Sequence, residues 1–133
     1  MERPEFRVPL RINPEDIDAL GHVNNVVYLQ WVQEAAAAHW DKLASPAERQ
    51  GIAWVVMRHE IDYRHAALLG DSVYALTRVG ETEGVRSVRY VDMYKEPGIL
   101  LASARTTWVM VDAQTQRPRR IGPEFLAVLD RRV

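Results

Sequence analysis

The residues from Asp16 to Tyr28 carry the groups of this chain that are best suited to chemistry. They read D-x-D-x-x-G-H-V-N-N-x-x-Y, and a stretch free of Gly and Pro follows. A helix beginning near Asn24 leaves the N–H groups of its first turn without partners inside the helix. Those groups and the positive end of the helix can hold an oxygen on which negative charge develops, while a nearby carboxylate attacks or accepts a proton. The spacing therefore predicts nucleophilic or acid–base chemistry at a substrate carbonyl group.

Several other chemistries are excluded by residues that the chain lacks. It contains no cysteine, which removes disulfides, thiolate nucleophiles and cysteine-based zinc sites together. It also lacks the G-x-G-x-x-G, P-loop, H-E-x-x-H and G-x-S-x-G patterns of nucleotide, zincin and serine-hydrolase sites. His59 and His65 do not have a recognised ligand spacing. We therefore predict that no metal is required.

The charge and hydropathy of the chain constrain its partners and its location. The net charge is -1, which disfavours nucleic-acid binding through a cationic surface. No segment approaches the ~18 apolar residues of a membrane span, and the first residues do not resemble a signal peptide. We therefore expect a cytoplasmic protein that binds neither nucleic acid nor membrane.

The elements that must position these residues are one long helix and several strands. Residues Asn24–Lys42 are apolar around most of the helix circumference, which is typical of a buried helix. Gly80 and Gly84 are expected to bracket a hairpin turn. A short terminal helix is expected at Pro123–Arg132. Alternating patterns predict strands at Phe6–Ile12, Ile52–Tyr63, Ser72–Val79, Val85–Tyr94 and Leu100–Asp112.

This order of elements predicts the architecture. A chain of 133 residues forms one domain, here spanning residues 1–133. A sheet of antiparallel strands curled around a single helix is the economical way to bury that helix, which gives an α+β fold. Because such a sheet has open edges, pairing with a second copy is expected.

The segment DIDALGHVNNVVYLQWVQEA, which starts at Asp16, resembles the signature of the 4-hydroxybenzoyl-CoA thioesterase-like branch of hot-dog thioesterases. It is also similar to the corresponding stretch of plant acyl-ACP thioesterases, and a weaker resemblance continues through Glu60–Asp71. The resemblance implies a hot-dog fold with a five-stranded antiparallel sheet wrapped around one long central helix. It further implies hydrolysis of an acyl-CoA, no cofactor beyond coenzyme A as part of substrate and product, and a homodimer or dimer-of-dimers tetramer.

The resemblance also assigns catalytic roles to individual positions. Asp18 matches the catalytic carboxylate of the family and would act as nucleophile or general base, two roles that the sequence does not separate. Gly21 would let the loop turn tightly, and His22 would orient water or substrate. Backbone N–H groups at Val23, Asn24 and Asn25 would form the oxyanion site. Asn25 stands where some family members carry His, so no histidine acts at that place here.

Further positions are candidates for binding the substrate. Tyr28 is expected to pack at the helix start, and Glu34 is either a second acid or the partner of a buried polar group. Coenzyme A needs cations for its phosphates, and Arg64, Arg86 and Arg89 are the candidates. The acyl pocket is expected to involve Trp54, Trp108, Ala102 and Ala104.

Two other functions remain compatible with the same residues. One is an acyl-ACP thioesterase, which would prefer a carrier-protein thioester to its CoA counterpart. The other is a non-catalytic acyl-CoA-binding module that keeps the fold, although the acid at Asp18 argues against it. A hot-dog dehydratase is disfavoured because the histidine and proline signature of that branch is missing.

Overall fold

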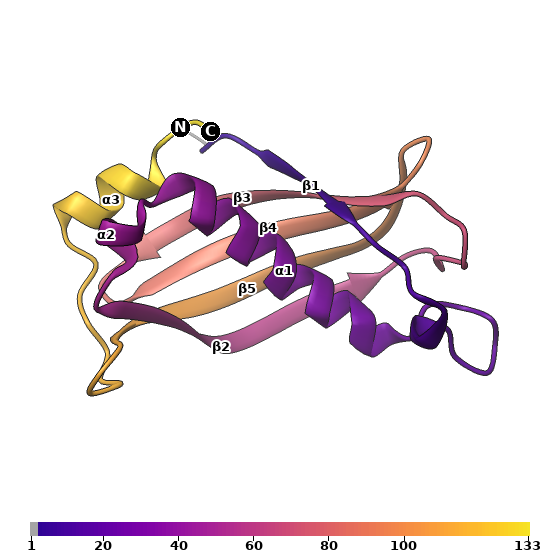
Figure 1. Ribbon diagram of the computed structural model, residues 1–133, viewed down its shortest axis with the longest axis horizontal. Coiled ribbons are helices and arrows are strands. Elements are labelled where there is room, and N and C mark those ends of the chain that lie inside the picture. Colours follow the sequence, from indigo (N-terminus) through magenta and orange to yellow (C-terminus); the bar gives the residue numbers. More distant parts are fainter. Residues whose placement is uncertain (1–2) are drawn as a thin grey trace.

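A single antiparallel sheet forms the body of the protein, as the computed structural model shows for residues 3–133 (Figure 1). The sheet has five strands in the order β1-β3-β4-β5-β2. The three central strands are joined in sequence by hairpins, and β1 and β2 form the two edges. The strands are β1 (Phe6–Leu10), β2 (Ile52–Tyr63), β3 (Val73–Glu83), β4 (Arg86–Lys95) and β5 (Ile99–Asp112).

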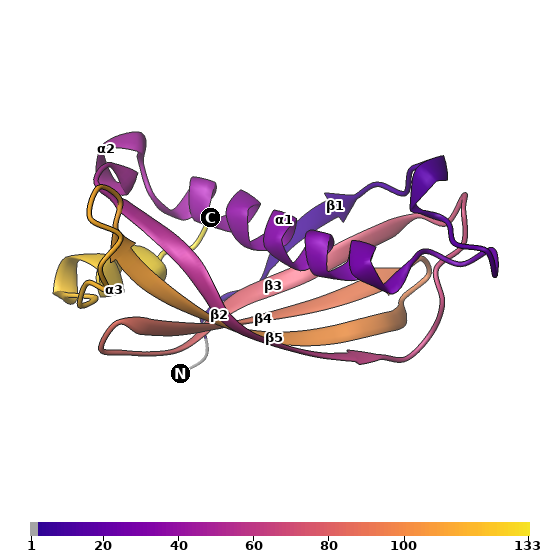
Figure 2. The same cartoon turned by 90° about the horizontal axis from the view of Figure 1, so that it is seen from below.

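One long helix, α1 (Asn25–Leu43), lies along the concave face of this sheet (Figure 2). Its inward side is built from residues without solvent exposure, such as Val32 and Ala35, which share a core cluster with Ala102 and Ala104 of β5. Small residues at these positions let the helix lie close to the strands. The architecture is the predicted α+β hot-dog fold.

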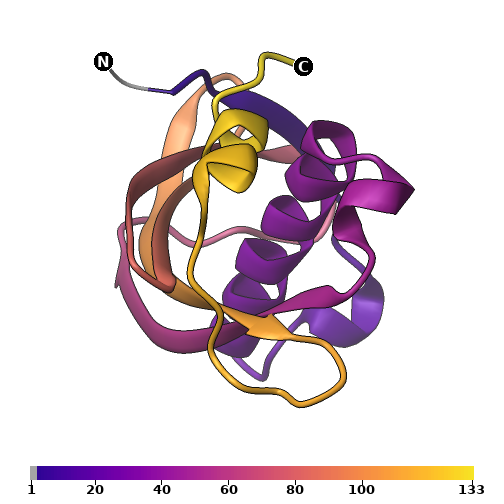
Figure 3. The same cartoon turned by 90° about the vertical axis from the view of Figure 1, so that its left-hand side faces the viewer.

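The ends of α1 are set by local capping. The side-chain Oδ1 of Asn24 accepts a hydrogen bond from the N–H of Val26 at 3.0 Å, which makes Asn24 the N-cap. At the other end the chain becomes extended at Ala44 and Ser45 caps a single turn, α2 (Pro46–Arg49). A helix at the end of the chain, α3 (Pro123–Leu129), packs beside α2 at the end of the sheet far from Asn24 (Figure 3). No helix within residues 3–133 is long and apolar enough to cross a membrane.

The hairpin between β3 and β4 differs from the expected one. Gly84 makes the turn with a φ of +63°, but Gly80 lies inside β3, within the register irregularity between Val79 and Thr82. A Cβ atom at Gly80 would stand 2.5 Å from Cε2 of Tyr90. The glycine therefore makes room for an aromatic ring on the neighbouring strand, and the prediction that it bounds the turn was wrong.

Helix α1 is also less enclosed than its composition predicts. The sheet covers one side only, and Val26, Gln30, Gln33, Glu34 and Ala37 are exposed in the single chain. The same open side carries the entrance to a cavity described below.

Candidate functional site

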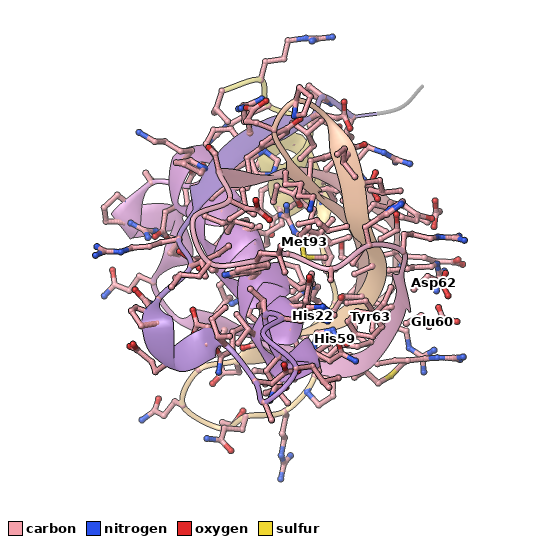
Figure 4. All side chains as sticks on the ribbon, turned by 90° about the vertical axis from the view of Figure 1, so that its right-hand side faces the viewer. His22, His59, Glu60, Asp62, Tyr63 and Met93 are labelled. Atoms are coloured by element: carbon pink, nitrogen blue, oxygen red, sulfur yellow. The ribbon has the colours of Figure 1, made fainter. Side chains whose placement is uncertain are left out.

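A cavity of about 430 Å³ lies at the N-terminal end of α1. Three segments enclose it: the loop that precedes α1, the first turn of α1, and the chain that leaves β2. Figure 4 looks onto this end of the molecule, where His22 and Tyr63 both line the cavity while Glu60 and Asp62 point outward. The lining residues are Asp18, Leu20, His22, Val23, Asn24, Asn25, Tyr28, Tyr63, Arg64, His65 and Ala66.

Asp18 is held by the backbone of its own loop. Its Oδ1 accepts hydrogen bonds from the N–H groups of Leu20 at 2.9 Å and His22 at 3.2 Å. Its own N–H donates to the carbonyl of His22 at 2.8 Å, and Gly21 closes the turn with a φ of +82°. Within residues 3–133 no hydrogen bond engages the second carboxylate oxygen, Oδ2. The carboxylate is therefore fixed in orientation with one oxygen available to a ligand.

Only one of the three predicted oxyanion donors remains available. The N–H of Val23 donates to the carbonyl of Ala67 at 2.8 Å, and the N–H of Asn24 donates to the carbonyl of Asp16, also at 2.8 Å. The N–H of Asn25, the first residue of α1, has no partner in the part of the chain that the structure describes. Of the three expected oxyanion donors, the N–H of Asn25 is therefore the one that can still bind a ligand. The N–H groups of Val23 and Asn24 are used to hold the loop against the rest of the fold.

Two tyrosines connect β2 to the first turn of α1. Tyr28 is buried, and its hydroxyl accepts a hydrogen bond from the N–H of Ala67 at 3.2 Å. Its ring packs edge-on against the ring of Tyr63, with 5.4 Å between the ring centroids. The hydroxyl of Tyr63 donates to the carbonyl of Asn25 at 3.2 Å. Burial raises the pKa of both phenols, so both stay protonated at neutral pH. These contacts hold the free Asn25 N–H in place.

Tyr63 and His65 were not predicted as site residues. His65 lines the cavity, and its Nδ1 donates to the carbonyl of Leu100 at 3.1 Å, which leaves Nε2 as the available ring nitrogen. Their only signal in the sequence was the weaker resemblance over Glu60–Asp71. Residues 3–133 contain no group of three or more His, Cys, Asp or Glu side chains placed to hold a metal ion.

The remaining predicted residues are spread over the molecule. Arg64 lines the cavity beside Asp18. Arg86 begins β4 at the opposite end of the sheet, and Arg89 is buried, with a hydrogen bond to His39. Glu34 is exposed on α1 and does not line the cavity. The structure thus brings one of the three arginines to Asp18 within a single chain.

The residues expected to shape an acyl pocket do not lie beside Asp18 either. Ala102 and Ala104 belong to the core beneath α1. Trp54 and Trp108 line a second cavity toward the other end of α1.

Comparisons with known proteins agree with this fold. The model of the family described as the thioesterase-like superfamily matches residues 12–129. The long-chain acyl-CoA thioesterase FadM of Escherichia coli is 28% identical, over 96% of this chain and 99% of its own. The acyl-CoA thioester hydrolase YbgC of E. coli is also 28% identical, over 92% of this chain and 93% of its own.

Solved structures of thioesterases also share this fold. A Thermus thermophilus thioesterase, crystallised with coenzyme A and zinc, superposes with a TM-score of 0.82 at 25% identity, covering 92% of this chain and 90% of that one. The probable thioesterase YbaW of E. coli superposes with a TM-score of 0.76 at 27% identity, covering 96% and 98%.

Proposed function

The chain belongs to the thioesterase-like superfamily, and from that membership we propose that it hydrolyses acyl-CoA thioesters with Asp18 as its catalytic carboxylate. The observation that carries this proposal is the pairing of two free groups in one cavity. The unpartnered oxygen of Asp18 and the unpartnered N–H of Asn25 belong to residues that line the same space. Loss of hydrolysis on substitution of Asp18 is the decisive test.

The proposed reaction assigns one task to each of these groups. The thioester carbonyl oxygen accepts the N–H of Asn25, so that negative charge developing on it is met by a donor at the positive end of α1. Asp18 either attacks the carbonyl carbon or takes a proton from the attacking water. The C–S bond breaks, the sulfur takes up a proton, and water supplies the oxygen of the released acid. Both roles of Asp18 are compatible with its single free oxygen.

Arg64 is the arginine that this proposal assigns to the phosphates of coenzyme A, because it lines the cavity of Asp18. The substitution Arg64→Ala is expected to weaken the binding of acyl-CoA about ten- to a hundredfold, the effect of losing one charge-assisted contact of roughly 1.5–3 kcal/mol. Hydrolysis of an acyl-pantetheine, which lacks the nucleotide, should change little. KM values for the two substrates measure the difference.

The matched control for this prediction is Arg86→Ala, which removes an exposed arginine at the other end of the sheet. It should leave both substrates unaffected unless a partner chain brings Arg86 to the site. Equal losses for acyl-CoA and acyl-pantetheine in Arg64→Ala would refute the phosphate contact and indicate a general defect.

We also propose that two copies pair through strand β2. Among residues 3–133 this strand pairs only with β5, so one side of its backbone is open. It is 12 residues long and contains no proline. Its side chains Val55 and Met57 are 47% and 49% exposed to solvent. The other edge, β1, is five residues long and contains Pro9, features that protect an edge from pairing. The tetramer and the cytoplasmic location stay predictions.

The double substitution Val55→Glu/Met57→Glu is expected to convert the dimer into a monomer, since like charges would face each other across the paired strands. Light scattering at low micromolar concentration measures the mass. Leu68→Glu/Leu69→Glu is the control, because it introduces the same two charges at loop leucines that are 44% and 56% exposed. A wild-type protein that is monomeric and active at that concentration would contradict the proposal.

A further inference from the structure

A second cavity, of about 200 Å³, lies toward the C-terminal end of α1, and it shares no lining residue with the cavity of Asp18. Its walls are largely aromatic and apolar, and it is bounded by α1, the sheet and the end of α3. Gln33 and Ala37, on the open side of α1, are its exposed lining residues. The other lining residues are Ala36, Trp40, Trp54, Val79, Ser87, Arg89, Trp108 and Leu129.

Arg89 places a positive charge in this cavity without a counter-ion. The residue is only 6% exposed, and its Nη1 contacts Nδ1 of His39 at 2.8 Å and Oγ1 of Thr77 at 3.1 Å. Burial lowers the pKa of His39 to about 4, so the imidazole is neutral and accepts this hydrogen bond. Burial lowers the pKa of Arg89 to about 10, which still leaves it charged at neutral pH. No carboxylate within residues 3–133 forms an ion pair with it, although buried charges are normally paired.

Trp108 provides a second unused donor at the same place. Its indole Nε1 is buried and has no hydrogen-bond partner among the described residues. A buried indole N–H usually finds an acceptor, because leaving it unpaired costs the desolvation of the group. A cation and an N–H donor thus line one apolar cavity, and each lacks the acceptor that its chemistry requires.

We propose that this cavity binds a small monocarboxylic acid with an aromatic or short aliphatic body, its carboxylate placed between Arg89 and Trp108. One carboxylate supplies both missing acceptors and neutralises the buried charge. The remaining walls, including Trp40 and Trp54, suit an apolar body. A cavity of about 150 Å³ holds a benzene ring, so the volume here is sufficient for a ring with one carboxylate. Within one chain this cavity shares no lining residue with that of Asp18, so the acid binds here as a free molecule.

Calorimetric titration of the purified protein with benzoate and hexanoate tests this site, with benzamide as the uncharged counterpart of benzoate. Benzoate is expected to bind about ten- to a hundredfold more tightly than benzamide, the effect of one charge-assisted contact. Arg89→Met should remove that preference and leave the weak binding of benzamide unchanged. If neither acid binds at millimolar concentration, or if benzoate and benzamide bind equally, the proposal is wrong.

Two further variants keep the test decisive if Arg89→Met does not fold. Ala37→Trp fills the entrance from an exposed helix position and should abolish binding of both acids while the protein stays folded. Trp108→Phe removes the indole N–H and keeps an aromatic wall. It should therefore weaken the binding of benzoate several-fold more than the binding of benzamide. Unchanged benzoate binding in both variants would overturn the assignment. Because binding is measured without turnover, this result is independent of the proposed hydrolysis.

Discussion

Replacing Asp18 with Asn is expected to slow acyl-CoA hydrolysis by about 10²–10⁴-fold, the scale for a positioned acid–base group. The amide oxygen of Asn can still accept the N–H groups of Leu20 and His22, which now bind Oδ1 of Asp18. The loop should therefore keep its shape, while the group that attacks or takes a proton is lost. Free-thiol release measures the rate, and thermal unfolding and CoA binding should stay close to wild type.

Asp16→Asn is the control for this experiment, because it makes the same chemical change two residues earlier. Oδ2 of Asp16 accepts the N–H of Asn13, and the residue does not line the cavity. This variant should keep nearly full activity. Near wild-type turnover in Asp18→Asn would remove Asp18 from the mechanism.

The substitution Asn25→Pro is expected to lower kcat by about 10²–10³-fold, the effect of deleting one oxyanion donor. Proline has no N–H, yet it is well tolerated at the first position of a helix. The preceding residue, Asn24, already has φ -60° and ψ 139°, the extended conformation that proline requires of its neighbour. The helix should therefore form, and steady-state kinetics should show a lower kcat with little change in KM.

Asn25→Ala separates the backbone from the side chain in this test. It keeps the N–H, so its kcat should stay within a few-fold of wild type if the backbone group is the donor. A large loss in Asn25→Ala and an equal one in Asn25→Pro would assign the effect to the amide side chain. Circular dichroism on both variants shows whether α1 is intact.

Much of the fold could be predicted because its local signals agree with one another. The bounds of β2, Ile52–Tyr63, are the predicted ones, since turn formers precede it and its pattern is consistent throughout. Gly80 was misread because a glycine inside a strand and a glycine in a turn look alike in sequence. Only the ring of Tyr90, brought beside it by strand pairing, distinguishes the two.

The candidate site could be predicted only as far as its contiguous part. Asp18 and Asn25 belong to one local motif, and both line the cavity. The sequence could not show that the Val23 N–H is already used, because its acceptor is the carbonyl of Ala67, 44 residues away along the chain. The burial of Arg89 could not be predicted from the sequence either, since strand periodicity does not reveal how deeply a charged side chain is enclosed.

The way in which Asp18 is held has a consequence for the evolution of this loop. Its carboxylate is positioned by main-chain groups of Leu20 and His22, which any residue other than proline would supply. Leu20 is 80% exposed and lines the mouth of the cavity. Its side chain can therefore be exchanged without moving the carboxylate, so substrate preference can drift at this position while the chemistry is inherited unchanged.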